Sequence, residues 1–241
     1  MTFRTVCTWR PPHDRPGENV ATPRYGGRRK ADPFAYREGD DGMEGAAVAV
    51  PRTGWAATAR DELADLENLW QDLDIPGHRI ELIDGQLVVS PTASRWHSTA
   101  IHKLIDALID VTRERGWVIH TNLTVHIPPT RERLIPDLMI AAPDAPGFGD
   151  DELLSHGILL AAEVVSPSSQ RQDRTAKPRA YAQGQVPLYL LIDPVAEPTA
   201  VTLFSRPSGG RYRRRQSCGT DGALWIPEPF ALSIEGKHLL T

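Results

Sequence analysis

The sequence predicts a domain of the α/β class, because apolar runs typical of buried strands occur together with amphipathic helical stretches. The runs ILLAAEVV at 158–165 and VPLYLLIDP at 186–194 are almost continuously apolar, as expected for strands covered on both faces. Between them, Asp173, Lys177 and Tyr181 recur every four residues, which places them on one face of a helix. Strand, helix and strand therefore follow one another in this part of the chain.

Length and composition are those of one folded domain, alone or with an appendage. Of the 241 residues, 40% are hydrophobic and 24% charged, as in ordinary globular proteins. The net charge of −4 gives no overall attraction to nucleic acid, so such binding requires a local basic patch. Cys7 and Cys218 match neither a disulfide framework nor a zinc site, which favours the reducing cytoplasm. The sequence contains neither a membrane-spanning apolar run nor a secretory signal.

The first 50 residues differ from the rest. They are rich in Pro, Gly, Arg and Asp and have no helix or strand period, so burial cannot offset the entropy lost on ordering. We predict a disordered extension over 1–50 and a folded domain over 55–241. The basic GGRRK at 26–30 could contact phosphate, although a solvated tail is the simpler interpretation. Met43 opens a more ordinary start, which leaves open that translation begins there.

A helix and a hairpin are expected at the beginning of the folded domain. The stretch 58–73 has leucines at helical spacing and acidic residues on the remaining face, which predicts an amphipathic helix. In HRIELIDGQLVVSP, apolar residues alternate on both sides of Asp84 and Gly85, the pattern of a hairpin. Glu81 lies on its first strand, opposite the apolar face, where spacing alone suggests a surface carboxylate.

A longer helix is predicted to follow and to end at Gly116. Apolar residues recur at helical spacing from 101 to 109, and either Ser94 or Ser98 can cap the start. His97 comes directly after the Pro- and Ser-containing turn that follows the hairpin. A solvated or structural histidine is the commoner outcome at such a position.

The segment that follows is predicted to contain short strands and loops. The stretch 117–129 is a strand or a strand pair, and PTRERL, at 129–134, is expected to be a loop. PDLMIA, at 136–141, is a short buried strand with Asp137 at its beginning, where the side chain can reach a cleft. The segment 142–157 is expected to be a surface loop with one helical turn at DDELL, capped by the acid pair at 150–151.

Two features remain open in the C-terminal third. Pro178 lies within the helix predicted over 170–184, where proline costs about 3 kcal/mol, so the helix either bends there or begins its regular part there. An edge hairpin is expected to turn at 208–210, and its second strand carries a basic group with Tyr212 interleaved. This group includes Arg211, Arg213 and Arg214. Charge on an edge strand prevents sheet-to-sheet pairing, and a phosphate-contacting patch is the alternative.

Asp137 and Glu163 carry the main functional signal, because burying an unpaired carboxylate costs several kcal/mol. If their strands pair, one shared divalent cation is the simplest compensation. Mg²⁺ or Mn²⁺ prefers oxygen ligands, and the backbone carbonyl of Val164 would complete the set. Such a cation activates water and offsets charge on a phosphate, and Lys177 could position or deprotonate that water. These residues predict metal-assisted phosphodiester hydrolysis.

From residue 79 to residue 194 the chain resembles the Uma-type family of putative restriction endonucleases, within the PD-(D/E)XK nuclease superfamily. The matching motifs are ELIDGQLVVSP with the downstream His97, then PDLMI, EVVSPSS, D-x3-K-x3-Y and YLLIDP. Each motif is weak alone, and the specificity comes from their joint occurrence in this order.

The resemblance implies a restriction-endonuclease-like core, with a mixed β-sheet flanked by helices. It assigns the catalytic site to Asp137, Glu163, Lys177, Glu81 and His97. Asp137 and Glu163 are its metal ligands, and Lys177 is a catalytic lysine that has moved to the following helix. The standard D/E-X-K motif places lysine at position 165, where this chain has Val165. Asp173 could orient Lys177.

The predicted function is therefore that of a Mg²⁺-dependent endonuclease acting on DNA. A non-cleaving nucleic-acid-binding module and a partner-binding protein with a structural ion pair at Lys177 remain as alternatives. The intact acidic pair argues against the first alternative, whereas Val165 and the acidic net charge argue for it. A serine hydrolase using Ser166 or Ser168 is a poor match because a G-x-S-x-G motif is missing. The recognition sequence and the oligomeric state, a homodimer included, are left open.

Overall fold

The computed structural model describes residues 59–241, so the predicted disordered segment, GGRRK and Met43 lie outside the described residues. Its largest feature is a mixed six-stranded central sheet, in which β9 and β10 are parallel and the other neighbours antiparallel. The strands, in spatial order, are β12 (Arg211–Cys218), β11 (Ala200–Ser208), β10 (Leu188–Asp193), β9 (Ile158–Val164), β6 (Leu138–Ala141) and β3 (Val118–His120). The predicted strands at 158–165 and 186–194 are thus neighbours in one sheet.

A second six-stranded sheet and a short hairpin complete the β structure. The second sheet contains, in spatial order, β2 (Gln86–Pro91), β1 (His78–Ile83), β5 (Glu132–Leu134), β4 (Thr124–Ile127), β8 (Glu152–Leu154) and β7 (Gly147–Phe148). The hairpin pairs β13 (Ala223–Ile226) with β14 (Leu232–Glu235). The stretch 117–129 therefore contains two strands, β3 and β4. They belong to different sheets and do not pair with each other.

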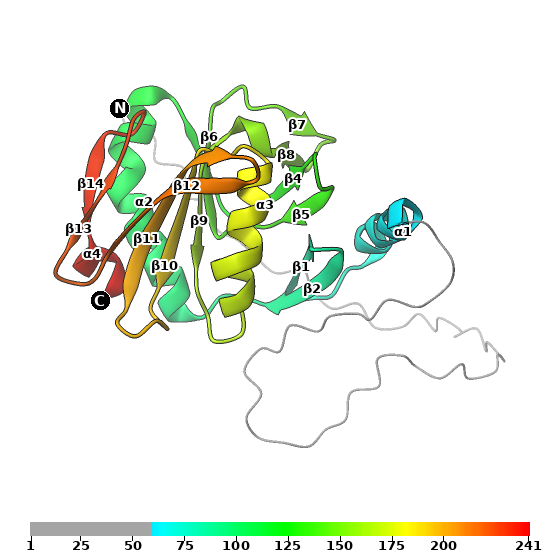
Figure 1. The fold of residues 1–241 in the computed structure, drawn as a ribbon, viewed down its shortest axis with the longest axis horizontal. Coiled ribbons are helices and arrows are strands. Elements are labelled where there is room, and N and C mark those ends of the chain that lie inside the picture. Colours follow the sequence, from blue (N-terminus) through cyan, green and yellow to red (C-terminus); the bar gives the residue numbers. More distant parts are fainter. Residues whose placement is uncertain (1–58) are drawn as a thin grey trace, which may run out of the picture. The chain divides into compact units, whose positions relative to one another are not determined.

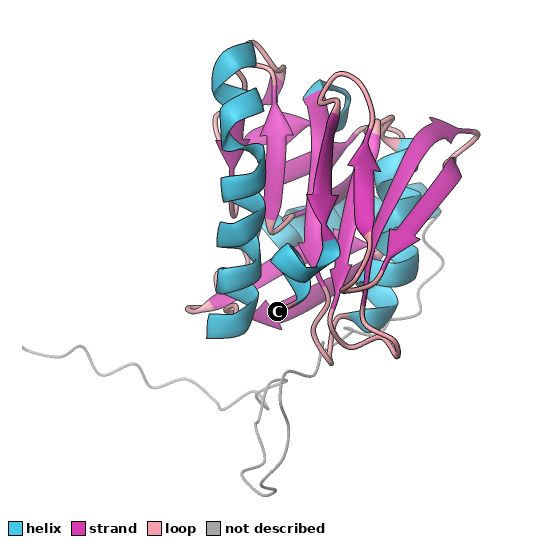
Figure 2. Cartoon of the chain, turned by 90° about the vertical axis from the view of Figure 1, so that its left-hand side faces the viewer, coloured by secondary structure: helices cyan, strands magenta, loops and turns pink. Residues whose placement is uncertain are grey.

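The helices are α1 (Ala59–Asp72), α2 (Arg95–Arg115), η1 (Ser155–Gly157), η2 (Gln172–Ala176), α3 (Lys177–Gln183) and α4 (Gly236–Leu240). Along β9, alternate side chains face opposite sides of the central sheet. Leu160 and Ala162 pack with Leu104 of α2 on one side. Figure 2 shows α2 running alongside the strands of the central sheet. On the other side Ala161 packs with Tyr181 of α3, which lies between the two sheets (Figure 1). The predicted mixed sheet flanked by helices is confirmed.

No helix in the described part of the chain is both long and apolar enough to cross a bilayer.

Several local predictions are confirmed at their turns and caps. Asp84 and Gly85 have φ angles of 54° and 66°, the left-handed backbone that a tight two-residue hairpin requires. Of the two candidate caps, Ser94 precedes α2, and its hydroxyl accepts a hydrogen bond from the amide of His97 at 3.3 Å. Gly116 ends α2 with φ 68°. These turns fix where the second sheet and α2 meet the central sheet.

The loop predicted over 129–134 is wrong at its C-terminal half, which forms β5. Glu132 and Arg133 are buried there, where distant groups supply a hydrogen bond to the first and an ion pair to the second. Glu132 accepts a hydrogen bond from the backbone amide of Asp84 at 2.9 Å, and Nε of Arg133 lies 2.7 Å from Oε2 of Glu152. The sequence shows only two adjacent charged residues, which are typical of a loop. The partners that allow their burial, Asp84 and Glu152, are remote along the chain.

The helical turn predicted at DDELL is also wrong. The segment 142–157 contains β7 and β8, and β8 pairs with β4 in parallel. The acid pair at 150–151 lies in the turn between β7 and β8 and caps no helix. Pairing with β4 supplies the backbone hydrogen bonds that an isolated helical turn would lack, so tertiary structure overrides the local preference.

The structure resolves the position of Pro178. Residues 172–176 form one wide π-helical turn, η2, and the regular helix α3 begins at Lys177 with Pro178 in its first turn. Proline is tolerated in the first turn, where its missing amide would have no helical partner. The regular part of the helix therefore begins at Lys177, the residue before the proline.

We predict that Leu104→Ala will lower the free energy of unfolding by about 2–5 kcal/mol, since Leu104 is fully buried between α2 and the central sheet. Urea denaturation followed by circular dichroism measures this loss. Asp106→Ala on the exposed side of the same helix should change stability by no more than about 0.5 kcal/mol. Equal losses in the two variants would contradict the packing described for α2.

Candidate functional site

Asp137 and Glu163 lie opposite each other on neighbouring strands. In the antiparallel pair of β6 and β9, Leu138 is opposite Ala162, so the preceding Asp137 faces the following Glu163. The backbone amide of Val164 donates a hydrogen bond to Oδ2 of Asp137 at 2.9 Å. Both carboxylates are buried, with exposed fractions of 6% for Asp137 and 1% for Glu163. The strand register thus brings together two acids that are far apart in the sequence.

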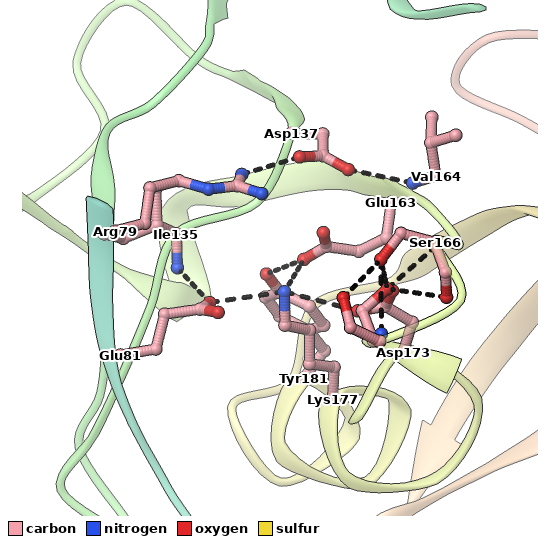
Figure 3. A network of polar contacts seen from close by, with 12 residues as sticks. Arg79, Glu81, Ile135, Asp137, Glu163, Val164, Ser166, Asp173, Lys177 and Tyr181 are labelled. Carbon is pink, nitrogen blue, oxygen red and sulfur yellow. Dashed lines mark hydrogen bonds and ion pairs between the residues drawn. The ribbon is translucent and has the colours of Figure 1, made fainter. Parts of the chain in front are cut away.

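Lys177 reaches back from the start of α3 to these strands. Its Nζ lies 2.9 Å from Oε1 of Glu163, 3.2 Å from Oε1 of Glu81 and 3.4 Å from Oδ1 of Asp173 (Figure 3). The lysine side chain is itself buried. One cation therefore contacts carboxylates from β9, from β1 of the second sheet and from η2.

Glu81 is a buried residue, which corrects the surface position suggested by spacing alone. Its Oε1 accepts a hydrogen bond from the backbone amide of Ile135 at 2.7 Å in addition to its contact with Lys177. Glu81 is buried because its side chain on β1 points toward Lys177 at the start of α3. Glu81 thereby joins the two sheets at the site.

Arg79 and His97 complete the surroundings of Asp137. Nη1 of Arg79 lies 2.6 Å from Oδ1 of Asp137, and Nε2 of His97 lies 2.8 Å from its Oδ2. His97 belongs to the predicted set, whereas Arg79 does not. Its signal in the sequence is weak: Arg79 comes two residues before Glu81 on β1, hence on the same face of that strand.

Two buried tyrosines donate hydrogen bonds to Glu163 and to the backbone of Asp173. The hydroxyl of Tyr181 donates to Oε1 of Glu163 at 3.3 Å, and the hydroxyl of Tyr189 donates to the carbonyl of Asp173 at 2.8 Å. The two rings stack with centroids 5.3 Å apart. The face shared by Asp173, Lys177 and Tyr181 in the sequence is therefore the buried face of the helix.

The two central carboxyls have opposite pKa shifts. Burial by itself would raise the pKa of Asp137, but the contact with His97 and the charges of Arg79 and Lys177 outweigh it and hold the pKa well below the ordinary range. Burial raises the pKa of Glu163 well above its ordinary value, because Lys177 compensates it only in part and the neighbouring acids repel its charge. Burial opposes the charged form of Lys177, yet Glu163, Glu81 and Asp173 raise its pKa and keep it protonated.

The donor set has the chemistry that a hard divalent cation requires. Four carboxylates surround two permanent cations, Arg79 and Lys177, which leaves negative charge uncompensated when the acids ionise. Apart from its ion pair with Lys177 at 3.4 Å, Oδ1 of Asp173 is buried without a hydrogen-bond partner among the described residues. Asp137, Glu163 and Val164 line a cavity of about 370 Å³ together with Lys177. Within residues 59–241, however, no three acidic, histidine or cysteine side chains converge as they do around a bound metal.

The remaining predicted residues lie apart from this cavity. Arg211, Arg213 and Arg214 are exposed on β12, at an edge of the central sheet, and are not among the residues that line the cavity. Val165 is buried in the apolar core between the two sheets. Position 165, where the standard motif has its lysine, is thus a core position here.

The fold and the site define a nuclease-like α/β protein, with two acids on paired strands and a lysine on the adjoining helix. The chain belongs to the Uma2 family, described as putative restriction endonuclease, whose model matches residues 60–237. It is similar in fold to the crystal structure of a putative nuclease belonging to DUF820 from Anabaena variabilis. The TM-score is 0.58 at 17% identity, over 73% of this chain and 96% of that one. No curated protein matches the chain.

We predict that Lys177→Met will lower the free energy of unfolding by about 3–5 kcal/mol near neutral pH, because it leaves buried carboxylates without their cation. Adding Glu163→Gln to this variant should recover part of the loss by removing one of the acids that Lys177 contacts. Urea denaturation of the four proteins in the cycle measures the coupling. Lys237→Met, at an exposed pair with Glu235, serves as the control and should have little effect.

A pH dependence follows from Asp173, whose pKa burial raises from 3.8 to about 6. The folded protein holds this proton more tightly than the unfolded chain does, so the contribution of Asp173 to stability falls as the pH rises from about 4 to about 6. Asp173→Asn removes the ionisation. We expect this variant to be more stable than the wild type near neutral pH and to lose that advantage near pH 4, as measured by urea denaturation. A variant less stable than the wild type at neutral pH would show that the Lys177 contact dominates.

Proposed function

We propose that this protein is a divalent-metal-dependent endonuclease that hydrolyses DNA phosphodiester bonds, with Mg²⁺ or Mn²⁺ as its cofactor. The observation that supports this most is the placement of Asp137 opposite Glu163, with the amine of Lys177 2.9 Å from Glu163. A cavity of about 370 Å³ is lined by all three of these residues. Membership in a family of putative restriction endonucleases agrees with a nucleic-acid substrate.

Asp137, Glu163 and the backbone carbonyl of Val164 are the groups that would hold the metal. A bound divalent cation lowers the pKa of its water and offsets the charge that develops on a phosphate. Asp137 is well suited to a ligand role, because its low pKa keeps it ionised at neutral pH. Glu163 has a raised pKa, so a cation that replaces its proton stabilises the charged form.

Lys177 would act through its charge. Its raised pKa keeps the amine protonated, so it is poorly suited to accept a proton from water. A protonated amine beside Glu163 can orient the attacking water and stabilise negative charge on the phosphate. Glu81 fixes the amine from the opposite side, and its own position is fixed by the amide of Ile135. His97 holds the second oxygen of Asp137 and would support the site at its rim.

One observation favours a different candidate, a non-cleaving module whose acids form a structural ion-pair cluster. Both oxygens of Asp137 already have partners in Arg79, His97 and the amide of Val164. Lys177 likewise neutralises several acids without any metal. A protein of this kind would bind nucleic acid or a partner protein through other surfaces, among which the arginines of β12 are exposed.

The decisive experiment is a titration of Mg²⁺ and of Mn²⁺ in a supercoiled-plasmid nicking assay. We expect metal-dependent nicking by the wild type and a decrease of at least about 100-fold in Asp137→Asn, Glu163→Gln and Lys177→Met, since each removes a ligand or charge at the reacting phosphate. Asp144→Asn, an exposed acid outside the cavity, is the control and should leave the rate unchanged.

The same proteins distinguish the two candidates. In the nuclease, saturating Mn²⁺ should raise the stability of the wild type by about 2.7 kcal/mol at 100 times its Kd, because the ion binds only the folded state. Asp137→Asn and Glu163→Gln should abolish this gain. Absence of both nicking and Mn²⁺-induced stabilisation in a folded wild type would reject the nuclease and favour the structural cluster.

A further inference from the structure

Arg79 makes the shortest contact of Asp137, with Nη1 of its guanidinium 2.6 Å from Oδ1. The Arg79 side chain is 21% exposed, whereas that of Asp137 is 4% exposed. The guanidinium therefore approaches the buried carboxylate from the side open to solvent. It takes the oxygen that neither Val164 nor His97 contacts.

The partners of Asp137 differ in how readily they can leave. The amide of Val164 belongs to β9 and is held by the sheet. His97 is fixed in the first turn of α2, whose cap is Ser94. Arg79 has a long flexible side chain, and its Nε is buried without a hydrogen-bond partner among the described residues. Arg79 is also the more exposed of the two side chains that contact Asp137, at 21% against 11% for His97, so it is the one that can reach solvent or a ligand when it moves.

Space for such a movement exists on both sides of Arg79. The cavity of about 370 Å³ contains Glu163 and Lys177, and a second cavity of about 820 Å³ lies on the side of α1 and α2. Arg79, His97 and Asp137 line both of them. Arg79 can therefore turn away from Asp137 and remain in the wall of the site.

We propose that Arg79 is an exchangeable counterion: it neutralises Asp137 in the metal-free protein and moves to a phosphate of the nucleic acid when a divalent cation takes Oδ1. The inference rests on the proposed function and adds a positioning residue to that site. The guanidinium supplies the positive charge at Oδ1 of Asp137 that a bound cation would otherwise supply. A buried carboxylate is thus never left without a positive partner.

The first test compares Mn²⁺ binding to the wild type and to Arg79→Gln by isothermal titration calorimetry without DNA. Glutamine keeps a donor near Asp137 but carries no charge, so Mn²⁺ no longer competes with a cation. We expect Mn²⁺ to bind Arg79→Gln about tenfold more tightly than the wild type. Arg179→Gln removes another arginine paired with an aspartate, Asp84, away from both cavities, and should leave the affinity for Mn²⁺ unchanged.

The second test measures how a cation changes DNA binding. Fluorescence anisotropy with a labelled DNA duplex, with and without Ca²⁺ in place of the reactive metal, gives the increase in affinity that the cation causes. We expect this increase to be larger in the wild type than in Arg79→Gln, because only the wild type releases a guanidinium toward phosphate. Arg179→Gln should behave as the wild type does.

The outcomes separate this inference from the proposed function. Unchanged or weaker Mn²⁺ binding by a folded Arg79→Gln overturns the counterion role, even if the wild type nicks plasmid. Tighter Mn²⁺ binding with an unchanged effect of Ca²⁺ on DNA affinity overturns the transfer to phosphate. Mn²⁺ binding by Arg79→Gln but not by the wild type supports the counterion role and counts against nuclease activity of the wild type. If neither protein binds Mn²⁺, both proposals fail.

Discussion

The buried amine of Lys177 is the interaction on which the rest of the site depends. A carboxylate removed from water costs several kcal/mol unless a cation or hydrogen-bond donors compensate it. Lys177 does this for Glu163, Glu81 and Asp173 at once, from the first residue of α3. The central sheet, the second sheet and the helix can therefore meet around acidic groups instead of an apolar core. Contacts with these acids raise the pKa of Lys177 and keep the buried amine protonated.

The same constraint explains a second buried polar cluster, in the second sheet, where β5 and β8 lie on either side of β4. Arg133 contacts Glu152 and Glu67, and its guanidinium lies over the rings of Trp70 and Phe148. Those contacts compensate the charge within the fold and cover it with aromatic carbon. The site at Asp137 differs in that its cation, Arg79, is partly exposed and lies between two cavities. The two clusters therefore differ in the exposure of the arginine, whose side chain is 3% exposed at Arg133 and 21% exposed at Arg79.

The position of the lysine shows how the fold accommodates a departure from the standard motif. Val165 continues the apolar side of β9 into the core between the sheets, where a charged side chain would lack a partner. The amine of Lys177 comes to 2.9 Å from Glu163 because the wide turn η2 and the helix α3, with Pro178 in its first turn, direct it there. Asp173, one turn earlier, adds a further negative partner. A lysine amine therefore lies beside Glu163 even though the lysine comes from the helix that follows the strand.

The sequence by itself determined the elements whose signals are local: the helix over 95–115, the hairpin at Asp84 and Gly85, and the apolar strands with one acid each. It also singled out Asp137 and Glu163, because a charge within an apolar run is visible without any partner, and Lys177, because it shares a helix face with Asp173 and Tyr181. Only the tertiary structure decided that Glu132 and Arg133 form a buried strand and that Arg79 pairs with Asp137. The physical reason is that a buried charge is stabilised by groups remote in the chain. Those partners become evident when the strands pair and α3 covers them.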